Sequence, residues 1–308
     1  MGYDNDVNHI APPRLFVSLK GSQNNIAMEY RIAIPTDFSK NADKAARFAL
    51  ELFSGQACRF YLTHTYTPAF FRAEYLLHSP GQIGLGDMYQ ERVMKKLKKH
   101  KKTLLEHAGQ EHEIIPHAAF NSLAEELEDM GKKETLDLII MGTQGATGAR
   151  EVLFGTHAVQ VLHKASCPVL VVPEEAEVGT LEHLLFPTDF KPDYGKLPLK
   201  FLKYLLGKPE VVLHVLHAYT PADGEPERER GREQLKELLN GYTWEMTETS
   251  QGDIIGAINR FARDTPIQLL LLVRNTHTFL ENLLVTPVID QIGLHTRIPF
   301  LVIPPARE

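Results

Sequence analysis

Three of the four glycines in MGTQGATGAREVLFGT, the stretch from Met141 to Thr156, lie at a spacing suited to binding a ligand. Gly142 and Gly145 come first, and Gly155 follows after nine intervening residues. Glycine lets the backbone take a positive φ and approach a ligand closely, because it has no Cβ. Exposed amides of such a loop form a cradle for an anion, and the first amides of a helix favour a phosphate. The spacing therefore predicts a phosphate-binding loop, with the Thr156 hydroxyl either donating to the phosphate or capping the helix that follows.

A single glycine more often ends a strand or breaks a helix, and this stays open as the alternative interpretation of each of the three. Their context favours the binding role. They come directly after the apolar strand pattern LDLIIM (136–141), and the helix-forming run HAVQVLHKA (157–165) follows the last of them. In open α/β sheets, ligands bind beyond the carboxyl ends of such strands, where the strand order reverses.

Three segments of the first half recur in the second half. They are RIAIPTDF (31–38) with HLLFPTDF (183–190), THTYTP (63–68) with LHAYTP (216–221), and CPVLVVP (167–173) with IPFLVIP (298–304). Such self-similarity predicts two related domains, which we place at 28–175 and 180–306. The segment 1–27 is rich in Asn, Pro, Gly and Ser, so we expect a poorly ordered tail. Met28, just before the first strand, is a candidate natural start.

Short apolar strands alternate with helical patterns in both predicted domains. This alternation indicates βαβ crossovers and a parallel sheet covered by helices on both faces. The continuous apolar runs at 136–141 and at 269–273 (LLLLV) are typical of central strands that are buried on both sides. We therefore predict an α/β fold of two tandem, doubly wound, five-stranded parallel sheets.

Composition and charge exclude several kinds of binding partner and site. The 308-residue chain carries a formal net charge of −6, which argues against nucleic acid as a main ligand. No apolar run approaches the roughly 20 residues that cross a bilayer, so we expect no membrane partner. The two cysteines, Cys58 and Cys167, form no CxxC motif, and they favour a reducing, cytoplasmic setting. The 14 histidines show no metal-ligand spacing, so no metal site is predicted.

The pattern G-x-x-G-x9-G-[S/T], with PTDFS after the first strand and CPVLVV as the last strand, resembles that of the universal stress protein family. The resemblance is strong over 30–173 and degenerate over 182–304. It implies the doubly wound fold of universal stress proteins and of adenine nucleotide hydrolase-like proteins. In that family this glycine pattern marks the members that bind ATP. The resemblance therefore implies a nucleotide-responsive stress or regulatory protein that binds ATP, with or without Mg²⁺, in its first domain, and an unidentified protein partner.

The implied nucleotide site takes its residues from the ends of three strands and the start of one helix. They are Pro35, Thr36, Asp37, Thr65, Met141, Gly142, Gln144, Gly145, Gly155, Thr156 and His157. Asp37 would accept from a ribose hydroxyl or the base, although an Asp at such a turn also commonly bonds backbone amides. Thr65 departs from the valine that family members often place beside the adenine. Residues 155–157 would meet the phosphates.

The second domain lacks this glycine pattern. An ungapped alignment on the last strands places Val273 at Gly142, Thr276 at Gly145, Thr286 at Gly155 and Pro287 at Thr156. Each Cβ would obstruct a phosphate, and proline has no N–H to donate. Arg274 supplies one charge, which does not rebuild a cradle of amides. We therefore predict that the second domain does not bind ATP in the family manner.

The sequence has no Walker A, GxGxxG, GxSxG or kinase motif and no evident pair of base and nucleophile. It therefore predicts a binding protein, or at most a slow ATPase. The alternative is an interaction scaffold that binds no nucleotide; an adenylyl-transfer enzyme ranks last, because no phosphate motif follows the first strand. Family dimers pair through the last strand, so we expect an intramolecular pseudo-dimer through 168–172 and 300–304. A further homodimer stays open.

Two other segments have more than one interpretation. The basic run KKLKKHKK (95–102) predicts a solvated helix face, with a patch for phosphate or acidic groups as the alternative. The segment 69–90 combines aromatic residues with three glycines and a proline. It predicts either a lid over the site or an arm that packs against the protein.

Overall fold

The computed structural model describes eight stretches of the chain, and these carry every structural statement below. They are residues 30–66, 85–106, 112–143, 155–177, 179–218, 225–249, 254–274 and 297–305. The predicted tail 1–27 lies outside them, and so does most of the segment 69–90. Gln144 and Gly145 of the predicted loop, and residues 276, 286 and 287 of its counterpart, lie outside them as well.

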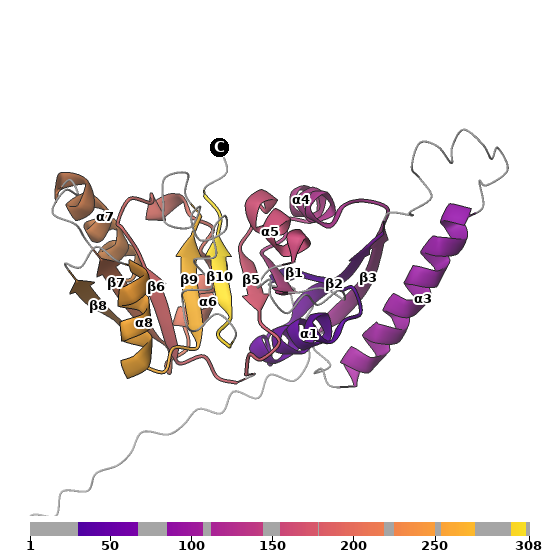
Figure 1. Cartoon of the computed structure of the whole chain (residues 1–308), viewed down its shortest axis with the longest axis horizontal. Helices are drawn as coiled ribbons and strands as arrows, with labels where there is room; N and C mark the ends of the chain where they lie inside the picture. Colours follow the sequence, from indigo (N-terminus) through magenta and orange to yellow (C-terminus); the bar gives the residue numbers. More distant parts are fainter. Residues whose placement is uncertain are drawn as a thin grey trace, which may run out of the picture.

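A ten-stranded sheet runs through the molecule in the order β3-β2-β1-β4-β5-β10-β9-β6-β7-β8 (Figure 1). Its strands are β1 (Tyr30–Pro35), β2 (Cys58–Thr65), β3 (Glu113–Ala119), β4 (Leu138–Gly142), β5 (Val169–Val172), β6 (His183–Pro187), β7 (Val212–Ala218), β8 (Trp244–Thr249), β9 (Leu269–Val273) and β10 (Phe300–Ile303). Strands pair in parallel within each half, and both halves have the same doubly wound order. The predicted fold class is confirmed.

The two halves meet through their last strands, β5 and β10, which pair antiparallel with Leu170 opposite Leu301. This is the pairing of 168–172 with 300–304 that the family resemblance implies. The ungapped alignment also matches the register, because Gly142 pairs with Val172 in the first half and Val273 pairs with Ile303 in the second. Val273 therefore occupies the place of Gly142.

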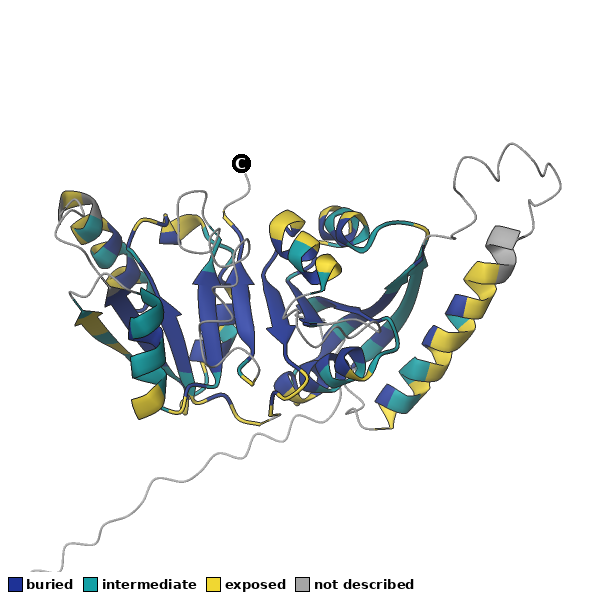
Figure 2. Ribbon diagram, viewed as in Figure 1, coloured by how far each residue is buried: buried dark blue, intermediate teal, exposed yellow. Residues whose placement is uncertain are grey.

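Helices cover both faces of this sheet, and its strands form the buried centre of the molecule (Figure 2). The helices are α1 (Lys40–Leu52), α3 (Leu85–Leu105), α4 (Leu123–Lys133), α5 (Thr156–Lys164), α6 (Lys200–Leu206), α7 (Glu225–Leu238) and α8 (Ile254–Asp264), with a short 3₁₀ turn η2 (Tyr194–Lys196). One apolar core lies under α1, α3, α6 and α7, and a second lies under α4, α5 and α8. This two-faced burial explains the continuous apolar runs of the central strands.

Local signals fix where the site-bearing helices begin. Ser39 caps α1 by accepting a hydrogen bond from the backbone N–H of Ala42 at 3.2 Å. Ser122 caps α4 by accepting from the backbone N–H of Glu125 at 3.4 Å, while the Ser122 hydroxyl donates to the Glu125 carboxylate at 2.9 Å. Such caps satisfy amides that a helix start leaves unpaired.

The basic run belongs to α3, which packs one narrow stripe against the sheet. Val93, Leu97 and Leu104 are buried, at helical spacing. The lysines between them, at 95, 96, 98, 99 and 102, are exposed. This arrangement matches the solvated helix face that the sequence predicts.

Aromatic side chains add a second contact between the halves. The rings of Phe53, after α1, and Tyr204, on α6, stack with centroids 5.2 Å apart and planes 8° apart. The Tyr204 hydroxyl donates to the Leu52 carbonyl at 3.3 Å. Lys200 of α6 pairs with Asp137, before β4, at 2.9 Å. The two halves thus share side-chain packing as well as a sheet.

Candidate functional site

A cavity of about 420 Å³ lies at the carboxyl ends of the strands in the first half. The strand order reverses between β1 and β4, since β1 pairs with β2 on one side and with β4 on the other. All the predicted site residues that the structure describes line this cavity: Pro35, Thr36, Asp37, Thr65, Met141, Gly142, Gly155, Thr156 and His157. Its size and position are those of a small-molecule pocket in an open α/β sheet.

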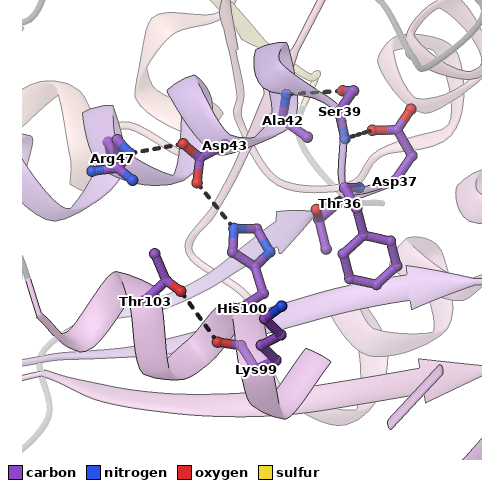
Figure 3. Close-up of polar contacts among 10 residues, drawn as sticks. Thr36, Asp37, Ser39, Ala42, Asp43, Arg47, Lys99, His100 and Thr103 are labelled. Atoms are coloured by element: carbon purple, nitrogen blue, oxygen red, sulfur yellow. Dashed lines mark hydrogen bonds and ion pairs between the residues drawn. The ribbon is translucent and has the colours of Figure 1, made fainter. Parts of the chain in front are cut away.

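The turn after β1 uses its own polar side chains to hold its backbone (Figure 3). The Thr36 hydroxyl oxygen accepts from the Phe38 N–H, and an Asp37 carboxylate oxygen accepts from the Ser39 N–H, both at 3.0 Å. Phe38 has a φ of 65°, which a side-chain-bearing residue adopts only when its surroundings impose it. Asp37 therefore bonds the backbone, as one of its two sequence interpretations predicts.

The second half repeats this turn. Thr188 accepts from the Phe190 N–H and Asp189 from the Lys191 N–H, both at 3.1 Å, and Phe190 has a φ of 61°. The Thr-Asp-Phe turn is thus part of the scaffold of both halves. Residues that differ between the halves must decide what the first cavity can bind.

His64 supports the same turn and lines the cavity, although the sequence analysis did not single it out. Its Nδ1 donates to the Thr36 carbonyl at 2.6 Å, so Nδ1 carries the proton in this contact. The His64 ring also packs on Phe38 with centroids 4.8 Å apart. His217 makes the equivalent bond to Thr188 at 2.8 Å. The available signal was the histidine shared by the repeats THTYTP and LHAYTP.

Gly142 corrects one expectation about the glycines. It does not have a positive φ, and a Cβ there would lie 2.2 Å from Oδ1 of Asn41 on α1. Asn41 is buried, and its Nδ2 donates to the Val172 carbonyl at 3.2 Å. The missing side chain at Gly142 therefore makes room for Asn41, and a Cβ would collide with that side chain before it obstructed any phosphate.

The helix α5 begins at the cavity with glycine as its N-cap. The Gly155 N–H donates to the Thr143 carbonyl at 2.9 Å, which brings together the two ends of the predicted loop. Gly155 has an ordinary φ of −62° and offers no side chain to cap the helix. Within the described part of the chain, the amides of Thr156 and His157 meet no acceptor. Helix amides in this position favour an anion.

The cavity offers a ligand backbone amides and polar side chains rather than positive charge. Among the described lining residues there is no lysine or arginine, and the ionisable side chains are Asp37, His64 and His157. Met141, Leu123 and the alanines of α1 and α5 supply an apolar wall. A mixed lining of this kind suits a flat apolar base with a phosphate at the α5 end.

Two further lining residues, Asn121 and Ser122, follow β3. The Asn121 Nδ2 donates to the Glu126 carboxylate at 3.1 Å, and the Asn121 Oδ1 accepts from the Ser122 N–H at 2.8 Å. Nε2 of His117 lies 2.7 Å from the other Glu126 oxygen. The sequence analysis missed these residues, although the rule that sites lie beyond strand ends applies to β3 as well as to β1 and β4.

Behind the turn, α3 is tied to α1 by a charged side chain (Figure 3). Asp43 of α1 accepts from Arg47 Nε at 2.7 Å, and Nε2 of His100 on α3 lies 3.1 Å from its other oxygen. Burial disfavours the Asp43 carboxylate, but the hydrogen bonds from Arg47 and His100 hold its pKa below the ordinary value. The ammonium of Lys96 lies 5.5 Å from the centre of the Phe38 ring. The His100–Asp43 contact and the Lys96–Phe38 contact together hold α3 beside the turn.

The equivalent place in the second half carries bulkier residues. By the alignment of the repeats, Tyr194 stands at Ala42, which lines the first cavity. Tyr194 is fully buried, and its hydroxyl lies 2.5 Å from that of Thr188. Burial raises the pKa of Tyr194 above its ordinary value. In the second half, the Thr188 hydroxyl is thus hydrogen-bonded to a tyrosine of the same half.

These features define a doubly wound α/β protein with a polar cavity at its strand-order reversal. Residues 28–173 match the model of the Universal stress protein family. Universal stress protein MJ0531 of Methanocaldococcus jannaschii is 32% identical over 147 residues, which are 46% of this chain and 81% of that protein. The chain therefore belongs to the universal stress protein family.

Other known proteins agree with this assignment. Universal stress protein MJ0577 of the same organism is 27% identical over 154 residues, 47% of this chain and 95% of that protein. The crystal structure of a universal stress protein from Archaeoglobus fulgidus covers 91% of this chain and 97% of its own, with a TM-score of 0.60 and 15% identity. That likeness extends the fold across both halves. No helix in the described stretches is long and apolar enough to span a bilayer.

Proposed function

We propose that this universal stress protein binds ATP in the cavity of its first half and acts as a nucleotide-responsive regulatory protein in the cytoplasm. The observation that supports this most is the convergence of the predicted residues on one cavity at the strand-order reversal. The family resemblance of the glycine pattern supplies the identity of the ligand. ATP would bind with or without Mg²⁺; the described residues contain no group of three or more His, Cys, Asp or Glu side chains placed to hold a metal ion.

The proposed roles follow from the lining. The phosphates would accept from the amides of Thr156 and His157 at the start of α5. The adenosine end would lie between the turn after β1 and the wall that includes Thr65 and Met141. Gln144 and Gly145 would complete the loop. In this proposal 28–175 is the binding domain, and 180–306 is a domain that does not bind ATP.

Thr156→Pro tests the role of the amides directly. Proline at the first position of a helix is tolerated, and Gly155 before it already has the extended backbone (φ −62°, ψ 148°) that a residue before proline requires. The change removes one N–H and should weaken ATP binding about 10-fold or more, the worth of one hydrogen bond to a charged group. Isothermal titration calorimetry on the full chain measures this effect.

Thr156→Val is the matched control, because it removes the hydroxyl and keeps the amide. It should weaken ATP binding less than Thr156→Pro does. Equal affinity for ATP in wild type and Thr156→Pro would contradict the assigned role of the amide. Absence of ATP binding by the wild type would favour the second candidate, an interaction scaffold without nucleotide.

A slow ATPase is the remaining variant of this proposal. Among the described lining residues, Asp37 and His64 both bond the backbone of the turn, and neither forms a pair of base and nucleophile. We therefore expect release of γ-phosphate to be far slower than exchange of bound ATP. A single-turnover assay with γ-labelled ATP separates these rates.

A further inference from the structure

Arg274 is the residue that the second half places where the first half has Thr143. Each follows directly after the strand that neighbours the reversal, β9 or β4. Its backbone N–H donates to the Ile303 carbonyl at 2.8 Å, so the chain is anchored at the end of β10. The side chain then leaves its own half and crosses the β5–β10 junction.

The Arg274 guanidinium ends at the last turn of α5, in the first half. Its Nη1 donates to the carbonyls of Leu162 and His163, the latter at 2.6 Å, and its Nη2 donates to the carbonyl of Ala165 at 3.0 Å. The last carbonyls of a helix have no partner within the helix, and a cation there also suits the helix dipole. Arginine presents several N–H donors in a rigid fork, which allows one side chain to bind three carbonyls.

The other end of α5 is the end that faces the cavity. This helix has only 9 residues, so a displacement of its last turn is passed to its first turn as a rigid body. No side chain caps the first turn, because its N-cap is Gly155. The position of the amides at Thr156 and His157 therefore depends on the Gly155–Thr143 backbone bond, on packing and on what holds the opposite end of the helix.

We infer that Arg274 is a positioning residue, by which the second half fixes α5 and with it the amides that face the cavity of the first half. Thr143 gives no such support in the opposite direction, because its hydroxyl donates to Asn41 of its own half at 3.5 Å. The second half, which lacks the glycine pattern, thus contributes to the site of the first half. The effect on nucleotide affinity rests on the proposed function, whereas the effect on α5 does not.

Amide exchange in the full-length, ligand-free protein tests the support itself. In Arg274→Ala, the hydrogen-bonded amides of α5, from Ala158 onward, should exchange about tenfold faster relative to those of α1. Arg274→Lys keeps the charge but loses the fork, so it should give an intermediate rate and remains informative if the alanine variant fails to fold. Arg263→Ala, which removes an exposed arginine at the end of α8, is the control and should leave α5 unchanged.

ATP affinity measured on the same proteins tests the link to the site. We expect about fivefold weaker binding in Arg274→Ala, about half the energy of one charged hydrogen bond, and no change in Arg263→Ala. Unchanged exchange of α5 in Arg274→Ala would overturn the inference. Faster exchange with unchanged ATP affinity would overturn the link to the site. If the wild type bound no ATP, the proposed function would fail, and the exchange rates alone would decide the role of Arg274.

Discussion

Individual residues show which parts of the site are scaffold and which are specific to the first half. The Thr-Asp-Phe turn and its histidine recur in both halves with nearly the same distances. The halves differ beside the turn. Ala42 and Gly142 of the first half correspond to Tyr194 and Val273 of the second half. Ala42 leaves space in the first cavity and Gly142 makes room for Asn41, while larger residues occupy the corresponding positions in the second half. Residue size at these positions therefore distinguishes the halves.

Gly142→Ala should destabilise the protein by about 1–3 kcal/mol, the usual cost of overpacking a core. The reason is the contact with Asn41, whose Oδ1 would lie 2.2 Å from the new Cβ. Urea denaturation measures the loss. Gly179→Ala is the matched control, because a Cβ at Gly179 meets nothing within 4 Å, and it should change stability by less than about 0.5 kcal/mol.

A double variant separates this contact from other causes. Asn41→Ala combined with Gly142→Ala should cost less than the sum of the two single changes, because the shortened side chain leaves room for the new Cβ. If the losses in unfolding free energy of the two single variants simply added in the double variant, the two side chains would not compete for space. Bulky substitutions at Gly142 are for the same reason poor tests of ligand binding, since they disturb α1 first.

Among the elements, three neighbouring strands of the second half place a row of ionisable groups side by side. Nδ1 of His183 on β6 lies 3.0 Å from Nε2 of His214 on β7, and Nδ1 of His214 lies 3.5 Å from a carboxylate oxygen of Glu245 on β8. The ring of Phe261 on α8 packs against His214 at 5.2 Å. Burial lowers the pKa of His214 below 6.5, the neighbouring His183 lowers it further, and Glu245 partly opposes this.

Stability should therefore fall as the pH is lowered from neutrality. Below about pH 6.5 the unfolded chain takes up a proton at His214 more readily than the folded chain does, so protonation favours unfolding. The contribution of His214 to stability is fully present above this pH and is lost as the pH falls through the lower folded-state pKa. His214→Gln should flatten the dependence of urea midpoint on pH between 7 and 5, as measured by circular dichroism.

The exposed His163 provides the comparison for this pH experiment. His163→Gln should leave the slope of stability against pH as it is in the wild type. An unchanged slope in His214→Gln would assign the acid sensitivity to other groups. The sequence could not have indicated His214, because its burial arises from the packing of α8 against β7.

For the whole molecule, the sheet junction and the aromatic contact of α1 with α6 join the halves. Tyr204→Ala should cost about 3 kcal/mol, because it removes a stacked ring from the interface. Tyr204→Phe keeps the ring and loses the hydroxyl bond to Leu52, so it should cost about 1 kcal/mol or less. Differential scanning calorimetry should show one transition for the wild type. Two separate transitions in the wild type would contradict a shared interface.

Most of the fold could be predicted from the repeated segments and the apolar strand patterns of the sequence. Matching segments gave the alignment, and the alignment agrees with the strand register of the two halves. The pairing of the last strands followed from the family resemblance. The contact of Gly142 with Asn41 was not predictable, because it joins residues about 100 positions apart. Arg274 was noted only as a charge, since its partners lie in the other half. Long-range side-chain contacts leave no local signal in a single sequence.

The antiparallel bonds of β5 and β10 form between segments of one polypeptide. Their formation is therefore a first-order process that dilution does not reverse, unlike the association of separate subunits. The backbone edges of both strands are covered as soon as the chain folds, so neither can recruit a stray strand from another molecule. Because the two halves are encoded separately within one chain, a change in one half leaves the sequence of the other as it was, whereas in a dimer of identical chains it would alter both.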